Sequence, residues 1–187
     1  MIQNGIEKII EKHTVIPVVT LNSEEDVHAT VSKLIKAKIN CAEITLRTSF
    51  ALEGIEMMIN AYPSIDVGVG TVVNGHQIDE LNKIQGIKFM VSPGGSPSLL
   101  KKMNESKIPF LPGVVTPSEI VAGMELGVNV FKFFPANLFG GLKTLQTYGQ
   151  VFPSAKFCPT GGLNADNHKD FLALSNVCAV GGSWMLK

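Results

Sequence analysis

Short runs of apolar and β-branched residues recur along the chain, and a longer stretch with apolar residues at helical spacing follows nearly every run. This alternation is typical of strand–helix units, which build a parallel sheet covered by helices. The predicted strands cover residues 15–21, 42–48, 66–72, 89–93, 110–115, 128–134, 156–160 and 177–181. Eight strands joined by seven helical linkers therefore constrain the architecture more than any other feature.

The number of strands decides between two α/β architectures. Eight strands, with no Gly-x-Gly-x-x-Gly sequence after the first, favour a closed (β/α)8 barrel (a TIM barrel) over an open doubly wound sheet. A chain of 187 residues can bury one sizeable core, so we predict a single domain over residues 1–187. Two details are irregular for a barrel. Pro17 and Pro112 fall inside predicted strands, where proline removes a ladder donor, and the eighth outer helix is missing before Lys187.

Three linkers begin with helix-capping residues followed by acidic side chains. They are Asn22-Ser23-Glu24-Glu25, Thr116-Pro117-Ser118-Glu119 and Asn164-Ala165-Asp166. Each predicts a helix start, because a side-chain oxygen satisfies free N–H groups there and acidic residues complement the helix dipole. A further helix is predicted over residues 2–13, and either this helix or a neighbouring subunit would cover part of the barrel.

Charge and cysteine content narrow the class of partner. Sixteen basic and sixteen acidic side chains give zero net charge, so no overall field attracts nucleic acid or anionic lipid. The N-terminal segment lacks the apolar run of a signal peptide or a membrane span. Cys41, Cys158 and Cys178 form no Cys-x-x-Cys pair, and we predict small core residues of a cytoplasmic protein. The four histidines are dispersed, which predicts no metal site.

The predicted strand at residues 128–134 holds a lysine among apolar side chains. Side chains alternate between the two faces of a strand, so one set faces the barrel interior and the intervening phenylalanines face the outer helices. The interior set is Val130, Lys132 and Phe134. An amine among apolar neighbours loses the hydration of its charged form, which favours the neutral, nucleophilic amine. The alternative is a lysine that reaches solvent from a strand end; the aromatic neighbours and the following proline favour the nucleophile.

A polar set alternates in the same way within residues 42–48. Glu43, Thr45 and Arg47 share one face, and we expect them to line the interior beside Lys132. Buried charges need partners, and a carboxylate, a guanidinium and an amine can satisfy one another. The set is equally compatible with a structural ion-pair cluster. Beside an inward lysine, it also supplies what imine chemistry requires, an amine, an acid–base group and a cation that binds a carboxylate.

Paired glycines follow the last two predicted strands. Gly161 and Gly162 come after Thr160, and Gly181 and Gly182 come before Ser183. In (β/α)8 enzymes these two loops often bind phosphate through backbone N–H groups, and glycine permits the close approach. Each pair alone is typical of a plain turn, but the two positions together favour phosphate binding.

Six motifs together resemble one enzyme family. They are Glu43-Ile44-Thr45-Leu46-Arg47-Thr48, Gly70-Thr71-Val72, Ser92-Pro93-Gly94, Lys132-Phe133-Phe134-Pro135-Ala136, Pro159-Thr160-Gly161-Gly162 and Gly181-Gly182-Ser183-Trp184. In this order, and spread along almost the whole chain, they resemble the 2-keto-3-deoxy-6-phosphogluconate (KDPG) aldolase and 4-hydroxy-2-oxoglutarate (KHG) aldolase family. The first and fourth motifs are specific, whereas glycine pairs alone are not.

The resemblance implies a metal-independent class I aldolase, a lyase that uses a Schiff base, needs no cofactor and splits KDPG into pyruvate and glyceraldehyde 3-phosphate in the Entner–Doudoroff pathway. Lys132 would form the Schiff base and Glu43 would transfer protons. The implied substrate-binding residues are Arg47, Thr71, Pro93, Phe134 and Thr160. The implied phosphate-binding residues are Gly161, Gly162, Gly182 and Ser183. The family fold is a (β/α)8 barrel, usually a homotrimer.

Other activities remain open from the sequence. Within the aldolases, the substrate could be 2-keto-3-deoxy-6-phosphogalactonate, or unphosphorylated KHG as a second substrate. A second class is a sugar-phosphate isomerase or lyase without an imine, in which Lys132 acts only through its charge. A third is a phosphate-binding protein without catalysis.

Overall fold

The structure is a computed structural model that describes residues 3–186. The strands are β1 (Val15–Val19), β2 (Cys41–Thr45), β3 (Asp66–Gly70), β4 (Phe89–Val91), β5 (Phe110–Leu111), β6 (Gly113–Val114), β7 (Val130–Phe133), β8 (Lys156–Pro159) and β9 (Val180–Gly182). The helices are α1 (Gln3–Lys12), α2 (Glu24–Ala37), α3 (Ala51–Ala61), α4 (Gly75–Leu81), α5 (Pro97–Glu105), α6 (Pro117–Glu125), α7 (Gly141–Val151) and α8 (His168–Leu172), with 3-10 turns η1 (Ala136–Phe139) and η2 (Trp184–Leu186). Every predicted strand range overlaps a strand, so the predicted alternation is confirmed.

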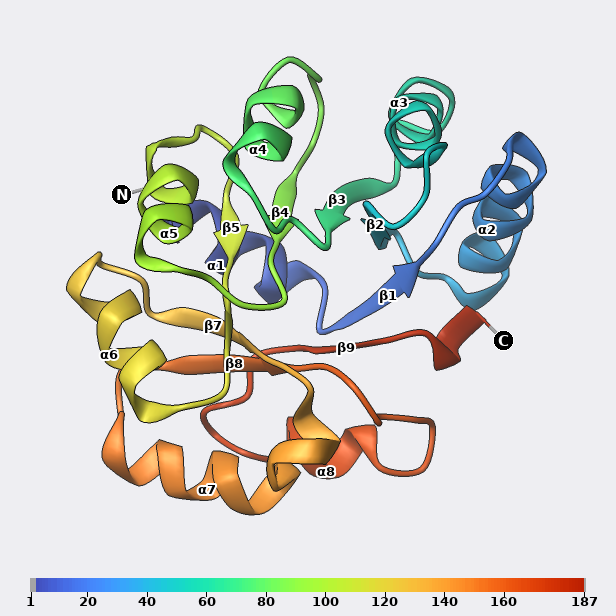
Figure 1. Cartoon of the computed structure of the whole chain (residues 1–187). Helices are drawn as coiled ribbons and strands as arrows, with labels where there is room; N and C mark the ends of the chain where they lie inside the picture. Colours follow the sequence, from blue (N-terminus) through green and yellow to red (C-terminus); the bar gives the residue numbers. More distant parts are fainter. Residues whose placement is uncertain (1–2, 187) are drawn as a thin grey trace.

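The strands form two parallel sheets (Figure 1). One sheet has six strands in the order β5-β4-β3-β2-β1-β9, and the other has three in the order β6-β7-β8. The prediction of a closed (β/α)8 barrel is therefore wrong, although the α/β class is right. The continuous ladder that a closed barrel requires is interrupted at two places, between β5 and β6 and between β8 and β9.

The first interruption lies at Pro112, inside the predicted fifth strand. Before it, β5 pairs with β4, and after it, β6 pairs with β7. Proline has no N–H to donate, but the Pro112 carbonyl accepts a hydrogen bond from the backbone N–H of Lys132 at 2.8 Å. The next residue, Gly113, donates its N–H to Ser92 Oγ at 3.3 Å. The chain thus changes partner at the proline and divides the sheet there.

The second interruption lies between β8 and the last strand. Only isolated bridges join the two segments, Phe157 to Val177 and Thr160 to Gly181. The ladder of β9 runs instead along β1, on its other side. Within β1, Pro17 lies opposite Gly182 in an unbroken strand. The predicted first strand is therefore confirmed despite its proline.

Two of the three predicted helix starts are confirmed. Ser23 caps α2, and Thr116 forms a capping box with Glu119 at the start of α6. The third prediction is wrong, because the Asn164 side chain accepts hydrogen bonds from the N–H groups of Asp166 and Asn167 in a turn. That turn delays α8 until His168.

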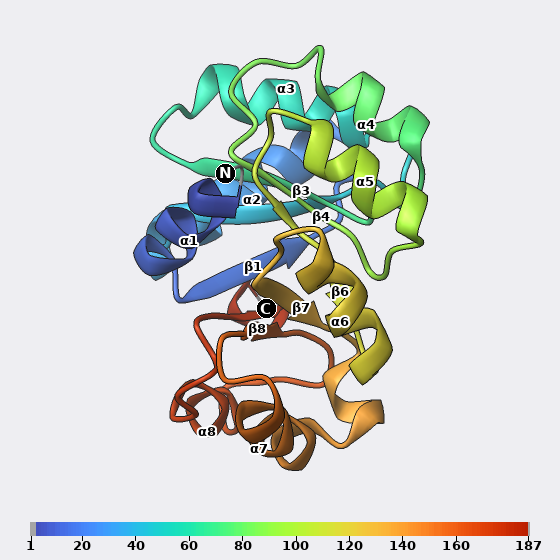
Figure 2. The same ribbon diagram turned by 90° about the vertical axis from the view of Figure 1, so that its left-hand side faces the viewer.

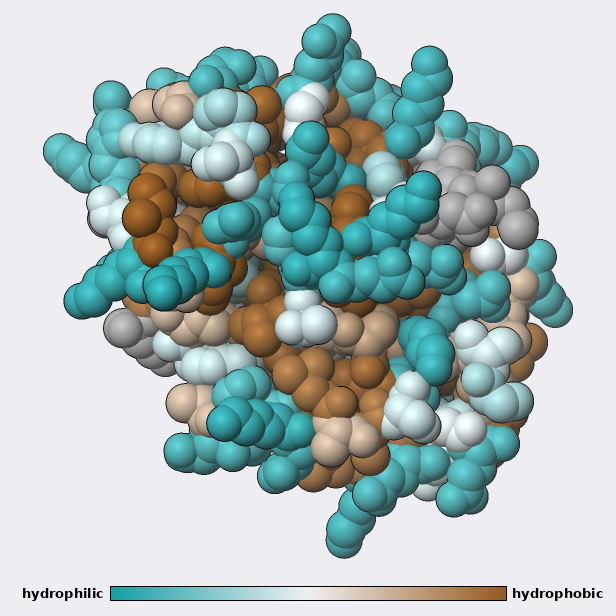
Figure 3. Space-filling view, turned by 180° about the vertical axis from the view of Figure 1, so that it is seen from behind, coloured by the Kyte–Doolittle hydropathy of each residue, from teal (hydrophilic) through white to brown (hydrophobic). Residues whose placement is uncertain are grey.

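Apolar side chains form two separate cores. The larger core lies between the sheets and the helices. Figures 1 and 2 show these helices on the outside of the sheets. The smaller core is enclosed by the inner faces of both sheets, and Ile6 and Ile10 of α1 pack against it. The N-terminal helix therefore covers one end of the enclosed space. Seen from behind (Figure 3), the surface of the molecule is largely hydrophilic, with apolar patches between the polar side chains. None of the helices between residues 3 and 186 combines the length and apolar character needed to cross a bilayer.

A polar cluster joins the end of α1 to the start of β3. Asp66 accepts hydrogen bonds from Lys12 Nζ and pairs with His13 Nε2, both at 2.7 Å. Burial alone would raise the pKa of Asp66, but the bonds and charges of Lys12 and His13 outweigh it and hold this pKa below its ordinary value. A carboxyl group with a lowered pKa stabilises the fold above its unfolded-state pKa, and this contribution is lost as the pH falls through the folded-state pKa.

We predict that Asp66→Asn lowers the free energy of unfolding at neutral pH by about 1–3 kcal/mol. The variant should also lose less stability than the wild type on acidification, because the titrating group is gone. Urea unfolding between about pH 7 and pH 3 measures both effects. Asp79→Asn is the matched control, since its ion pair with Lys102 is exposed and should contribute less than about 1 kcal/mol. Equal pH dependence in the wild type and Asp66→Asn would contradict the prediction.

Candidate active site

Lys132 lies on β7 and points into the enclosed space. Phe131 and Phe133 pack in the outer core, whereas Val130 packs in the inner core, so the predicted alternation of this strand is confirmed. The Lys132 side chain is 6% exposed. A lysine that snorkels to bulk solvent would be far more exposed, so the snorkelling alternative does not describe this residue.

Glu43 of β2 is the partner of Lys132. Its Oε1 lies 3.1 Å from Lys132 Nζ, and its side chain is 5% exposed. The strand next to β2 leaves room for this carboxylate, because a Cβ at Gly70 would collide with it. The two groups therefore form a buried ion pair that joins the six-stranded sheet to the three-stranded sheet.

The ion pair has an apolar surrounding. Lys132 Nζ lies 5.2 Å from the centre of the Phe134 ring, within range of a cation–π interaction. The attraction across 3.1 Å is about 5 kcal/mol at an effective dielectric constant of about 20, and desolvating the two charges costs a similar amount. Such a pair contributes little net stability. Because the pair lies beside a cavity, it is a candidate for chemistry as well as for structure.

Arg47 lies just beyond β2 and does not join the buried pair. Its Nε donates to Thr71 Oγ1 at 3.1 Å, so the predicted cluster of carboxylate, guanidinium and amine is divided into two pairs. Thr71 has a φ of 62°, a left-handed conformation that is unusual for a β-branched residue. Strained backbone of this kind occurs at ligand sites, where it holds a side chain in a fixed direction.

A cavity of about 490 Å³ opens at the carboxyl ends of the strands. Its lining residues are Val18, Thr20, Arg47, Lys132, Phe134, Thr160, Gly161, Gly162, Leu163, Gly182 and Ser183. Eight of the eleven residues predicted from the sequence line this cavity. Glu43 and Thr71 are joined to it by their hydrogen bonds to Lys132 and Arg47. Pro93 is not one of the residues that line the cavity, and its backbone lies against Gly113.

The two glycine loops form part of the wall of the cavity that Arg47 also lines. Gly161 and Gly162 have φ values of 98° and 76°, which L side chains rarely adopt. Their loop is held by η1, since the N–H groups of Ala136 and Asn137 donate to the carbonyls of Thr160 and Gly161. A Cβ at Gly162 would meet the Asn137 side chain. This wall therefore exposes backbone where an anion can approach closely.

The sequence prediction missed four residues of the site. Val18, Thr20 and Leu163 line the cavity, and Gly70 makes room for the Glu43 carboxylate. Thr20 and Gly70 lie near the ends of predicted strands and Leu163 lies just beyond one, which is the signal that was available, whereas Val18 lies in the middle of the range 15–21. Neutral residues at strand ends are common, however, and their chemistry alone singles out none of them.

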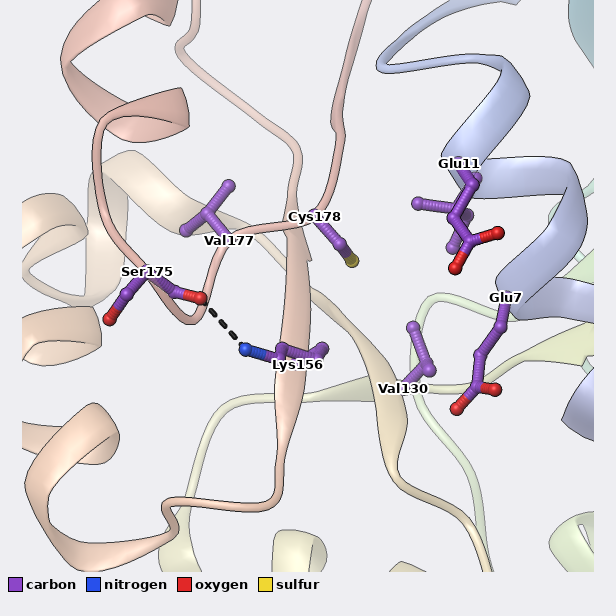
Figure 4. A pocket seen from close by; sticks show the side chains of 8 residues that line it. Glu7, Glu11, Val130, Lys156, Ser175, Val177 and Cys178 are labelled. Carbon is purple, nitrogen blue, oxygen red and sulfur yellow. Dashed lines mark hydrogen bonds between the residues drawn. The ribbon is translucent and has the colours of Figure 1, made fainter.

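A second hollow, of about 270 Å³, lies at the opposite ends of the strands (Figure 4). Glu7 and Glu11 of α1 and Val130 line it together with Lys156, whose Nζ donates to the Ser175 carbonyl at 2.8 Å. No residue predicted to be functional lines this hollow.

None of the three cysteines lines the cavity that contains Lys132. Cys41 and Cys158 are buried and Cys178 is partly buried, and all three are free thiols. Burial raises the pKa of Cys178 to about 11, so this thiol stays protonated at neutral pH. Between residues 3 and 186, no three His, Cys, Asp or Glu side chains are grouped as a metal site.

Comparison with known proteins gives a consistent set of relatives. The family model described as KDPG and KHG aldolase matches residues 6–187. A 2-dehydro-3-deoxy-phosphogluconate aldolase of Dickeya dadantii, whose name is a synonym of KDPG aldolase, is 41% identical over 184 residues, 98% of this chain and 86% of that protein. The KHG/KDPG aldolase of Escherichia coli is 39% identical over 184 residues, with the same coverage.

Solved structures agree with the sequence matches. A KDPG aldolase of Legionella pneumophila, with pyruvate captured as a covalent carbinolamine intermediate, has a TM-score of 0.91 and 40% identity, covering 95% of this chain and 86% of that chain. The KDPG aldolase of Zymomonas mobilis with 3-phosphoglycerate has a TM-score of 0.92 and 36% identity, covering 97% and 86%. Sequence and fold therefore indicate the same group of proteins.

Proposed function

This chain belongs to the KDPG and KHG aldolase family, and on that premise we propose that it is a class I aldolase that cleaves KDPG to pyruvate and glyceraldehyde 3-phosphate through a Schiff base on Lys132. The observation that carries the proposal is the buried contact of Lys132 Nζ with the Glu43 carboxylate at 3.1 Å, at the base of a substrate-sized cavity. An amine and an acid–base group in contact are the minimum that imine chemistry needs.

The reaction begins when the neutral amine of Lys132 attacks the C2 carbonyl of the substrate. The amine becomes neutral when the Lys132 ammonium passes a proton to Glu43. Glu43 then carries this proton, and a second one from the nitrogen, to the C2 oxygen, so that water leaves and an iminium ion forms with Glu43 ionised again. Glu43 then accepts the proton of the C4 hydroxyl while the electron pair of the C3–C4 bond moves into the iminium. Glyceraldehyde 3-phosphate leaves, and the remaining enamine is protonated at C3 and hydrolysed to pyruvate. One carboxylate beside one amine thus serves every proton transfer.

The two ends of the substrate bind at separate parts of the cavity. Arg47 binds the carboxylate at C1, and its hydrogen bond to the strained Thr71 fixes the guanidinium. Gly161, Gly162, Gly182 and Ser183 bind the phosphate through backbone N–H groups. Phe134 and Thr160 shape the wall between them. Pro93, whose backbone lies against Gly113, stays in the proposed set of substrate-binding residues.

We propose an assembly and a location that remain to be tested. The chain acts as a homotrimer in the cytoplasm. Leu138 and Phe139, adjacent in η1, are 73% and 48% exposed, which supports an interface with a second copy near the phosphate wall. Three free thiols support a reducing compartment. Light scattering should give a mass three times 20.1 kDa, and a monomer mass would contradict the trimer.

A coupled assay tests the proposed function. Purified protein is mixed with KDPG, and pyruvate release is followed with lactate dehydrogenase and NADH. KHG is the second substrate, because relatives carry the name KHG/KDPG aldolase and its C1 to C4 portion presents the same groups to Arg47 and Lys132. The phosphate wall predicts a higher kcat/KM for KDPG than for its unphosphorylated form. Absence of pyruvate from every substrate would contradict the proposal.

A further inference from the structure

Thr20 lines the cavity at the end of β1. It directly follows β1, and β1 lies between β2, which leads to Arg47, and β9, which leads to Ser183. Its side chain is exposed and lines the same cavity as the glycine loops. The Thr20 hydroxyl is therefore placed between the proposed carboxylate and phosphate ends of the substrate.

One hydrogen bond determines what this hydroxyl can offer. Thr20 Oγ1 lies 2.8 Å from Thr45 Oγ1, and Thr45 is fully buried. Among the described residues, Thr20 is the side chain that hydrogen-bonds the Thr45 hydroxyl. A buried O–H without an acceptor is costly, so Thr45 donates and Thr20 accepts. The proton of Thr20 is then directed away from Thr45 and is available as a donor to a ligand in the cavity.

We infer that Thr20 is a specificity residue that donates a hydrogen bond to the C5 hydroxyl oxygen of the substrate. The inference rests on the proposed function and adds a contact to the aldehyde half. With C1 at Arg47 and the phosphate at the glycine loops, the carbons between the imine and the phosphate ester carry hydroxyls only at C4 and C5. The C4 hydroxyl must face Glu43, which takes its proton. The C5 hydroxyl is the remaining acceptor for Thr20.

The test compares two reactions of the same enzyme. Cleavage of KDPG uses both halves of the substrate, whereas exchange of the methyl protons of pyruvate in D2O, followed by NMR, uses only the pyruvate half. Thr20→Val should lower kcat/KM for KDPG about tenfold more than it lowers the exchange rate. Thr20→Ser keeps the hydroxyl and should remain within about threefold of wild type in cleavage.

Two further arms separate recognition from a structural effect. The double variant Thr20→Val with Thr45→Val leaves no buried hydroxyl unpaired, and it should show the same selective loss. With 4-hydroxy-2-oxovalerate, which has no C5 hydroxyl, Thr20→Val and wild type should cleave at similar rates. Equal losses in cleavage and exchange, or full activity of Thr20→Val on KDPG, would overturn the inference. Failure of the wild type in both cleavage and exchange would instead overturn the proposed function, and the Thr20 inference with it.

Discussion

Lys132→Met should lower kcat for pyruvate release by about 10⁴-fold or more, because no other described side chain in the cavity carries an amine. Methionine fills a similar volume but cannot attack a carbonyl. The variant leaves Glu43 buried without its partner, which is expected to lower the free energy of unfolding by about 3–5 kcal/mol. Rates should therefore be measured at a temperature at which circular dichroism shows the variant folded.

Lys156→Met is the matched control for this prediction. Lys156 begins β8, is exposed and lies at the opposite ends of the strands from the cavity. Lys156 does not line the cavity, and surface substitutions usually change stability by less than about 0.5 kcal/mol. Its replacement should therefore leave the site intact and change kcat by less than about twofold. Pyruvate release by folded Lys132→Met at a substantial fraction of the wild-type rate would remove the proposed nucleophile.

Glu43→Gln should lower kcat by about 10²–10⁴-fold, the usual contribution of one acid–base group. Glutamine keeps the shape and can still hydrogen-bond Lys132, but it cannot carry a proton between the carbinolamine, the C4 hydroxyl and the enamine. Imine formation should be slowed but not abolished, because the amine remains. Single-turnover kinetics with KDPG separate the imine step from cleavage.

Glu56→Gln provides the comparison, because Glu56 is exposed on α3 and does not line the cavity. It should leave both steps at the wild-type rate. Unchanged cleavage by Glu43→Gln would show that another group moves the protons, and the paired roles of Lys132 and Glu43 would then have to be abandoned.

Local chemistry accounts for the elements that the sequence predicted correctly. Strand alternation and helix caps depend on neighbouring residues, as at Ser23 and Thr116, where the cap and its acidic partner are a few positions apart. The third predicted helix start is wrong because the Asn164 side chain accepts backbone hydrogen bonds in a turn instead of capping a helix. That competition is decided by loop geometry, which the residue types do not specify.

Closure of the sheet could not be predicted, because it depends on pairing between distant segments. Pro112 signals a lost donor, yet only the structure shows that its carbonyl bonds Lys132 and that the following strand changes partner. The short pairing between β8 and β9 is likewise a matter of register. That residues 1–187 form a single folding unit stays a prediction.

Strand parity predicted the centre of the site but not its edges. Lys132 and Glu43 alternate with apolar residues, so their shared interior could be derived from the sequence. Arg47 lies past the end of β2, where parity no longer fixes direction, and it bonds Thr71 instead of the buried pair. Thr20 escaped notice for a similar reason. Its role depends on a neighbour in the next strand, Thr45, whose position only the register supplies.

Borohydride reduction in the presence of pyruvate tests the central claim most directly. Reduction converts an imine between pyruvate and a lysine into a stable secondary amine, which peptide mass spectrometry can locate. The account predicts one adduct, on the peptide that contains Lys132, and its absence from Lys132→Met. An adduct on a different lysine, or none under conditions in which the enzyme releases pyruvate, would contradict it.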